Sequence, residues 1–249
     1  MNNIVDYPLL VFLSPFGALC LSALIGAFFR AALDERQRED FSIVQGAVLT
    51  LLGLLIGFTL SMAISRYEQR KNVEKAEANA IGTEYVRADL LPAADAVRVR
   101  ELLKSYLKPR VLFYTTRDRQ LLRQNDSDTT QLENELWSAV QARATAQPTP
   151  VMALAVSGMN EVLNSQGYTQ AAWWNRIPFE AWVLLAVIAI GCNLVIGYGS
   201  HRMSILLLVL PHAVSVSFFL IADIDSPRGG VIRGCPQNLV SRSQSLHAQ

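Results

Sequence analysis

Apolar residues of this chain gather in four blocks, and the charged residues gather between them. The blocks cover about residues 8–29, 44–64, 181–198 and 203–222. An uncharged stretch of about 20 residues is long enough to cross the hydrocarbon core of a bilayer as a helix. The pattern therefore predicts an all-α polytopic membrane protein with four transmembrane helices.

The second block runs into a polar stretch without any helix-breaking residue. Beyond Ile64 the chain is rich in Ala, Glu, Lys, Arg and Leu, which are good helix formers, and no proline occurs before Pro92. We therefore expect one continuous helix from Val44 to Leu91. It leaves the membrane near Ser65 and continues into water, where it needs partners of its own.

The segment between the second and third blocks has the pattern of a helical domain. We expect helices over about residues 93–123, 130–146 and 151–165, with a polar loop at 125–130. Gly167 is a stop signal for the last of these helices.

Two shorter segments are predicted to lack regular structure. Residues 30–42 carry nearly balanced charges and read as a solvated loop, and the polar residues after Asn238 predict a disordered tail. These expectations divide the chain into transmembrane helices one and two (1–64), a cytoplasmic helical domain (65–170), transmembrane helices three and four (171–225) and a cytoplasmic tail (226–249).

The basic residues beside the blocks predict which side faces the cytoplasm. Four spans put both termini and the helical domain on one side, which carries Arg66, Arg70, Lys71, Lys75, Arg176, Arg228 and Arg233. The opposite side carries fewer: Arg30, Arg36, Arg38 and Arg202. Because basic loops tend to stay inside, we expect a multi-pass protein of the cell inner membrane with both termini in the cytoplasm.

Two apolar stripes run along the membrane half of the long helix. Residues four apart lie on the same helix face, and one stripe consists of Ile56, Leu60 and Ile64, the other of Leu54, Phe58 and Met62. Either stripe could form a hydrophobic constriction that gates a pore by dewetting. The alternative is that both stripes pack on neighbouring helices or on lipid.

Small and basic residues frame these stripes. Gly53 and Gly57 match the small-xxx-small pattern that lets membrane helices approach closely. Arg66 and Arg70 lie one turn apart where the helix is expected to leave the membrane, and anchoring at the cytoplasmic face explains them. If several subunits brought them together, they would also form a basic ring that attracts anions at the mouth of a pore.

Two sequence blocks carry a resemblance to a known family. The run GFTLSMAISRYEQRK, followed by EANAIGTEYVRADLLP, and the later run DIDSPRGGVIR resemble the bestrophin-like family of bacterial membrane proteins, a domain of unknown function. The family motif includes residues to which we assign no role from the resemblance: Glu77, Asn79, Gly82, Arg87, Asp223, Asp225, Pro227 and Gly230.

A more distant resemblance connects the chain to bestrophins, which are pentameric anion channels. It rests on Gly57-Phe58, Ser61, Ala63, Arg66-Tyr67 and Arg70-Lys71. In bestrophins a similar run lies where the pore-lining second helix reaches the cytosol. The resemblance implies a homo-oligomer in the lipid bilayer, a pentamer if it holds, that conducts small anions such as chloride.

The two aspartates of the second block have two possible uses. Asp223 and Asp225 are two residues apart, and carboxylate oxygens are ligands that calcium accepts. A dedicated calcium site needs more oxygens than these, so helix capping and turn formation before Pro227 and Gly230 are the simpler use.

Composition and motifs argue against other classes of protein. The net charge of +1 gives no sign of nucleic-acid binding, and the three cysteines have no metal-site or disulfide spacing. No catalytic triad, metal-ligand cluster or phosphate loop indicates an enzyme, and we expect no metal and no cofactor. Two functions remain: an oligomeric anion channel whose second span lines the pore, and a non-conducting membrane scaffold or sensor.

Overall fold

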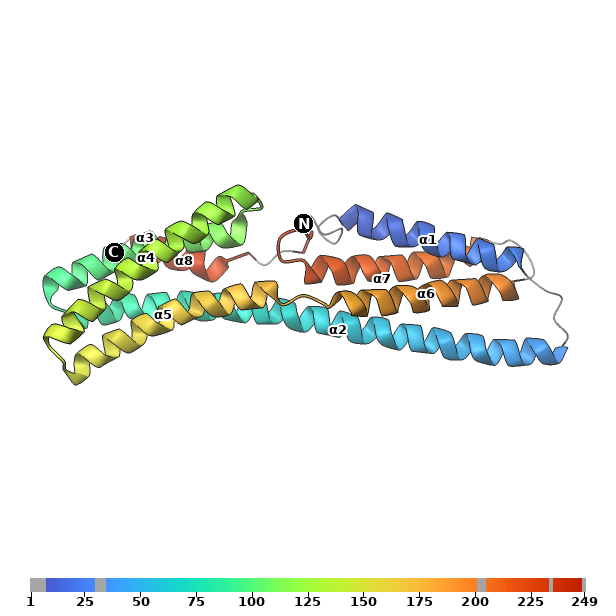
Figure 1. Cartoon of the computed structure of the whole chain (residues 1–249), viewed down its shortest axis with the longest axis horizontal. Coiled ribbons are helices and arrows are strands. Elements are labelled where there is room, and N and C mark those ends of the chain that lie inside the picture. Colours follow the sequence, from blue (N-terminus) through green and yellow to red (C-terminus); the bar gives the residue numbers. More distant parts are fainter. Residues whose placement is uncertain (1–7, 30–34, 201–204, 233–234, 248–249) are drawn as a thin grey trace. The chain divides into compact units, whose positions relative to one another are not determined.

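The computed structural model describes residues 8–29, 35–200, 205–232 and 235–247, and these form helices joined by short loops. In chain order they are α1 (Pro8–Phe28), α2 (Glu35–Arg87), η2 (Ala88–Leu90), α3 (Ala93–Thr115), α4 (Arg119–Ala146), α5 (Pro150–Trp174), α6 (Phe179–Gly199), η3 (Ile205–Leu208), α7 (Val209–Asp225) and α8 (Gln237–His247) (Figure 1). Of the residues used to predict the topology, Arg30, Arg202 and Arg233 lie outside the described ranges.

The helices group into two compact units. The first unit consists of Met1–Tyr67 and Arg176–Arg233, and the second consists of Glu68–Asn175 and Gly234–Gln249. The helix α2 passes from the first unit into the second without a break. The expectation of one continuous helix across the change from apolar to polar sequence is therefore confirmed.

Three described segments are long and apolar enough to cross a membrane: Leu10–Phe28, Glu39–Leu90 and Pro150–Gly199. The fourth apolar block is divided between η3 and the 17-residue α7, which follow one another directly from Ile205 to Asp225. A length of about 17 residues is at the lower end of what spans a bilayer core.

In the first unit, α1 lies against both α6 and α7 (Figure 1). The contact with α6 is close because small residues face one another: a Cβ at Gly26 would collide with the backbone of Leu194, and a Cβ at Gly197 with the backbone of Ala23. The hydroxyl of Ser22 donates to the carbonyl oxygen of Ile190 at 2.7 Å. Small residues of α1 thus let it pack closely against α6, as is usual where membrane helices meet.

The first half of α2 packs against the other helices of this unit with one face. Its Leu52 is buried in an apolar cluster with Leu19, Leu185 and Phe218. Further along, Ala63 is buried against Ile177 and Ile221.

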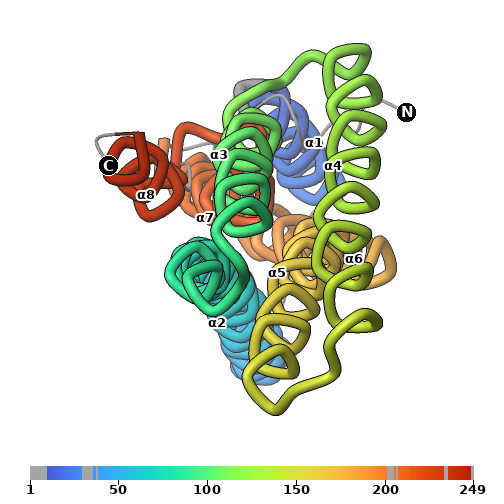
Figure 2. Tube along the Cα trace, turned by 90° about the vertical axis from the view of Figure 1, so that its left-hand side faces the viewer, coloured from blue at the N-terminus to red at the C-terminus, as the bar shows by residue number. Residues whose placement is uncertain are grey.

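The second unit is a helical bundle with an apolar core. α3 lies beside α4 and α8, and α4 lies beside α5 (Figure 2). The core includes Ile81 of α2, Leu103 of α3, Leu136 of α4 and Met159 of α5, all fully buried. The second unit covers Glu68–Asn175 and Gly234–Gln249, whereas the sequence suggested a helical domain over residues 65–170.

Several local expectations were wrong. Residues 35–42 are helical and extend α2 toward the N-terminus, and residues 125–130 lie inside α4. The helix α4 begins at Arg119, directly after Asp118, whose carboxylate caps the helix by accepting the backbone N–H groups of Gln120 and Leu121. Gly167 does not end α5, which continues to Trp174.

The polar tail is also ordered, contrary to expectation. Residues 237–247 form α8, whose Leu239 and Leu246 are buried in the core of the second unit. The carboxylate of Glu74 on α2 accepts hydrogen bonds from Asn238 Nδ2 at 2.6 Å and from the backbone N–H of Leu239 at 2.9 Å. Glu74 therefore caps a helix that lies far from it in sequence.

The contact between α1 and α6 generates a stability prediction. Gly197→Ala should destabilise the protein by about 1–3 kcal/mol, because the added methyl group meets rigid backbone rather than a movable side chain. Gly191→Ala, on the same helix with nothing within 4 Å of the added Cβ, is the matched control. Thermal unfolding in detergent measures the difference, and equal melting temperatures for the two variants would contradict this packing.

Candidate functional site

One face of α2 in the first unit is apolar and exposed within the chain. Leu54, Phe58 and Met62 are 52%, 62% and 42% exposed. Gly53 and Gly57 lie beside this stripe, and a Cβ at either position would have no neighbouring atom within 4 Å. Large apolar side chains and glycines thus share a surface that the described chain leaves about half exposed.

The other stripe is largely occupied by contacts within the chain. Ile56 and Leu60 pack against the buried cluster of Ala63, Ile177 and Ile221. Ile64, the third member of this stripe, is 42% exposed. The sequence left open which stripe is free, and the structure leaves Leu54, Phe58 and Met62 more exposed than Ile56 and Leu60.

The basic residues at the cytoplasmic end of this face, as predicted from the sequence, differ in exposure and in their contacts. Arg66 Nη1 lies 3.7 Å from Asp225 Oδ1, and the Asp225 side chain is almost fully buried. Arg70 is also buried, whereas Lys71 and Lys75 are exposed. The charge of Arg66 is therefore partly balanced by a carboxylate of its own chain.

The two aspartates of the later motif hold the backbone at the end of α7. Asp223 accepts hydrogen bonds from the backbone N–H groups of Val231 at 2.6 Å and of Ile232 at 2.8 Å. A Cβ at Gly230 would lie 2.5 Å from the carbonyl oxygen of Asp223, so this turn has room only for glycine. These contacts match the turn-forming use of the motif, in which Pro227 is half-buried.

Asp225 ties the same turn to the segment before α6. Its carboxylate accepts the backbone N–H of Ile177 at 3.2 Å, and Arg176 donates to the hydroxyl of Ser226 at 3.2 Å. Arg66 therefore reaches a carboxylate that is itself fixed by backbone donors. Among the described residues, no group of three or more His, Cys, Asp and Glu side chains is placed to hold a metal ion.

The family-motif residues of the second unit have different surroundings. Glu77 is fully buried, while Asn79 is exposed. Gly82 faces the guanidinium of Arg242 on α8 and leaves space for it. Arg87 lies close to Gly158 of α5.

Glu77 is the centre of a buried polar network. It forms an ion pair with Arg110 of α3, and it accepts hydrogen bonds from the hydroxyls of Tyr114 at 2.9 Å and Thr169 at 2.8 Å. Burial and the Glu77 carboxylate raise the pKa of Tyr114 well above its ordinary value, so this phenol stays a neutral donor. The network joins α2, α3 and α5 in the core.

The sequence did not reveal these partners. Arg110, Tyr114 and Thr169 lie 33, 37 and 92 residues from Glu77. Arg110 and Tyr114 are four residues apart on α3, which places them on one face. The four-residue spacing of Arg110 and Tyr114 was the one indication in the sequence that the two side chains act together. It does not indicate that their partner is Glu77.

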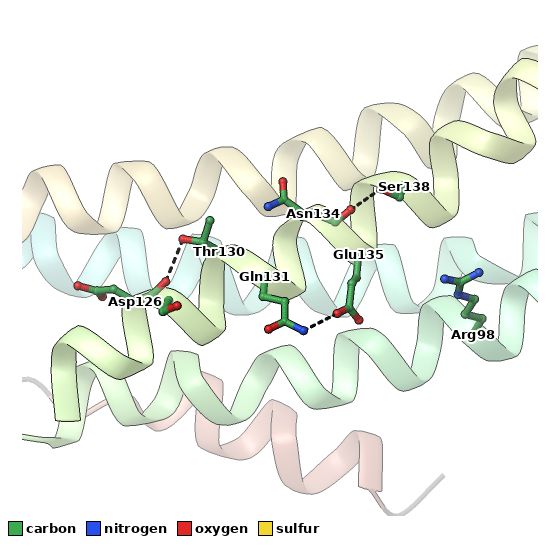
Figure 3. Close-up of a pocket in the computed structure, with 8 residues that line it drawn as sticks. Arg98, Asp126, Thr130, Gln131, Asn134, Glu135 and Ser138 are labelled. Carbon is green, nitrogen blue, oxygen red and sulfur yellow. Dashed lines mark hydrogen bonds between the residues drawn. The ribbon is translucent and has the colours of Figure 1, made fainter. Parts of the chain in front are cut away.

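The described surface of the second unit includes two grooves. One, of about 710 Å³, is lined by α4 and by Arg98 of α3 (Figure 3). Several of its polar side chains bond within α4 itself: Thr130 to the Asp126 carbonyl, Gln131 to Glu135, and Ser138 to the Asn134 carbonyl. The other, of about 610 Å³, lies between α3 and α8. Neither groove includes a residue that the sequence singled out.

The buried network generates a second stability prediction. Glu77→Leu should cost about 3–5 kcal/mol of unfolding free energy, because it leaves the Arg110 guanidinium buried without its counter-charge. The control is Asp95→Asn, which removes a partly exposed ion pair with Arg143 in the same unit and should cost less than about 1 kcal/mol. Denaturant unfolding in detergent compares them. A loss for Glu77→Leu no larger than that for the control would show that the network contributes little.

Comparison with known proteins gives the chain its family. A model of the Bestrophin-like domain matches residues 15–238. Two crystal structures of a bacterial bestrophin homolog from Klebsiella pneumoniae, each with a single substitution, are 13% identical to this chain; they cover 95% of it and 98% of their own length, with TM-scores of 0.68 and 0.66. A structure described as a membrane protein has 13% identity and a TM-score of 0.68, over 95% of this chain and 97% of its own.

The structural likeness and the family model support different statements. At 13% identity the similar structures show that the fold is shared, and they do not assign a function to this chain. No curated protein matches the sequence. The family model covers most of the chain and includes both motif blocks, and the chain therefore belongs to the bestrophin-like family.

Proposed function

We propose that the protein is an oligomeric membrane channel for small anions, with the face of α2 that bears Leu54, Phe58 and Met62 lining the pore. The observation that carries this proposal is the exposure of that face. A pore shared by several subunits needs a helix surface that its own chain does not cover. The resemblance to bestrophins implies five subunits around the axis.

The proposed pore depends on dehydration at its narrowest point. A ring of Phe58 side chains, with Leu54 and Met62 one turn away on either side, would surround the path with apolar surface. An ion that passes such a constriction loses part of its hydration, and the constriction can close by dewetting. In this arrangement Ile56 and Leu60 support the helix from behind, while Ile64 lies near the cytoplasmic end.

Anion preference would come from the basic residues beyond the constriction. Arg66, Arg70, Lys71 and Lys75 follow one another over three turns of α2. Salt screens exposed charges over about 8 Å at physiological ionic strength, so only charges near the path matter. Because Asp225 partly balances Arg66, the exposed Lys71 and Lys75 would add to the positive potential that Arg66 and Arg70 supply.

The alternative function is a non-conducting scaffold or sensor with the same fold. In that case the exposed stripe of α2 would pack against a neighbouring subunit or lipid and enclose no path. Flux measurements separate the two functions because only a channel responds to a smaller side chain at the constriction.

A flux experiment tests the channel. Phe58→Ala should raise chloride flux through reconstituted protein several-fold, since a barrier lowered by about 1.4 kcal/mol changes a rate tenfold. Ile56→Ala is the matched control: it also shortens an apolar side chain, but one that packs inside the chain, so it should leave the flux near the wild-type level. Light scattering must first establish that each variant has the wild-type oligomeric mass.

Two results would contradict the proposal. Correctly assembled wild-type and Phe58→Ala proteins that both lack flux would favour the scaffold. A larger increase for Ile56→Ala than for Phe58→Ala would assign the pore to the other stripe.

The proposed orientation is testable separately. We propose four spans, with η3 and α7 together as the fourth, and a cytoplasmic second unit. A cysteine introduced at Ser127 should then react with an impermeant maleimide only after the cells are opened, whereas one at Arg36 should react in intact cells. Both positions are exposed. A background variant without Cys20, Cys192 and Cys235 removes competing thiols, and labelling of Ser127 from outside would overturn the orientation.

A further inference from the structure

Glu84 of α2 is a buried carboxyl group whose oxygens accept no hydrogen bond from any described residue. Its side chain is fully buried in the second unit. Neither Oε1 nor Oε2 has a hydrogen-bond partner among the residues that the structure describes. A buried carboxylate without donors is far more costly than a neutral carboxylic acid. The burial alone therefore favours the protonated form of Glu84.

The close charged neighbour of Glu84 is Arg87, and the nearby acidic residues are exposed. The carboxyl lies against Gly158 of α5, where a Cβ would collide with Oε2. Glu161, one turn further along α5, is exposed, and Asp89 of η2 is exposed and paired with Arg100. Arg87 is the charged residue whose field acts on Glu84.

Arg87 is close to Glu84 but forms no ion pair with it among the described contacts. The Cβ position built on Gly158 lies 2.5 Å from Arg87 Nη1 and also in contact with Glu84 Oε2. The guanidinium is therefore just beyond ion-pairing distance of the carboxyl. Glu84 therefore has two arrangements that differ by a small side-chain movement. In one, the neutral acid packs on Gly158; in the other, the carboxylate pairs with Arg87.

We propose that Glu84 makes the packing of α5 on α2 dependent on protonation. In the protonated state the neutral carboxyl fills the space at Gly158 and α5 lies close. In the ionised state the carboxylate turns to Arg87 or to water, and the contact at Gly158 loosens. The device is independent of whether the protein conducts ions.

The direction of the pH effect follows from the same burial. Desolvation raises the pKa of Glu84 to about 8, and the opposing field of Arg87 reduces the rise. The ordinary pKa of a glutamic acid is about 4.3. A group whose pKa is higher in the folded state stabilises that state below its ordinary pKa. This contribution falls as pH rises toward about 8 and is lost above it.

Hydrogen exchange of α5 at a series of pH values tests the proposal. Glu84→Gln keeps the shape of the neutral acid and cannot ionise. The quantity to follow is the opening constant of the amides around Gly158 in the wild type, divided by the opening constant in Glu84→Gln at the same pH. This ratio should rise by up to about tenfold per pH unit between about pH 5 and 8 and then level off. Comparison at equal pH cancels the intrinsic dependence of exchange on hydroxide.

Two variants sharpen the test. Arg87→Gln removes the favourable field and should extend the rise to higher pH. Glu161→Gln removes an exposed glutamate of α5 and should leave the wild-type profile unchanged. A ratio that stays constant across the pH range, or an equal change in Glu161→Gln, would overturn the proposal.

A spectroscopic measurement on the wild type keeps the proposal testable if Glu84→Gln does not fold. Infrared difference spectra between pH 6 and pH 9 should lose the carbonyl band of one protonated, buried carboxylic acid. A conservative Glu84→Asp variant should move that band. Spectra that show no protonated carboxyl at pH 6 would refute the proposal without any variant.

Discussion

Helix α2 is 53 residues long and unbroken, and each of its halves needs packing partners in a different unit. An isolated helix gains little stability from its backbone alone, so most of its stability comes from packing of its faces. Its apolar half contributes Leu52 and Ala63 to the clusters of the first unit. Its polar half contributes Ile81 to the core of the second. Each unit therefore supplies the residues that pack against one half of α2.

The two halves are held by different kinds of contact. In the first unit the closest approach, between α1 and α6, comes from backbone against backbone at Gly26 and Gly197. Such contacts do not depend on a hydrophobic driving force, which is absent between helices in lipid. In the second unit a conventional apolar core surrounds the buried ion pair of Glu77 and Arg110. The first unit thus relies on close backbone contacts, and the second on an apolar core with a buried ion pair.

The sequence predicted the parts of the fold that depend on local pattern. The apolar blocks, the unbroken α2 and the family motif near Phe58 follow from composition, absence of proline and residue order, and the family assignment is confirmed. The end of α5 and the order of the tail could not be predicted in this way. Gly167 is tolerated inside a helix because neighbouring packing outweighs its local cost of about 1 kcal/mol. The tail is ordered by Glu74 and by burial of Leu239, which are both distant contacts.

The candidate site shows the same limit at the level of single residues. Periodicity identified two apolar stripes on α2, yet it could not distinguish them, because both have the spacing of a helix face. What separates Phe58 from Ile56 is the position of Ile177 and Ile221, more than 100 residues later in the chain, which cover one stripe and leave the other exposed. The pore hypothesis for Phe58 therefore depends on tertiary packing.

The acidic residues of the second unit show how the structure treats buried charge. Glu74 and Glu77 are buried, and each accepts hydrogen bonds from donors on other helices. Glu84 lies on the same helix and is equally buried, but Gly158 faces it with no side chain at all. Donors on other helices thus satisfy the oxygens of the first two carboxylates. The third has no such donor among the described residues, so α2 carries two fixed contacts and, about two to three turns further along the helix, one contact that a proton controls.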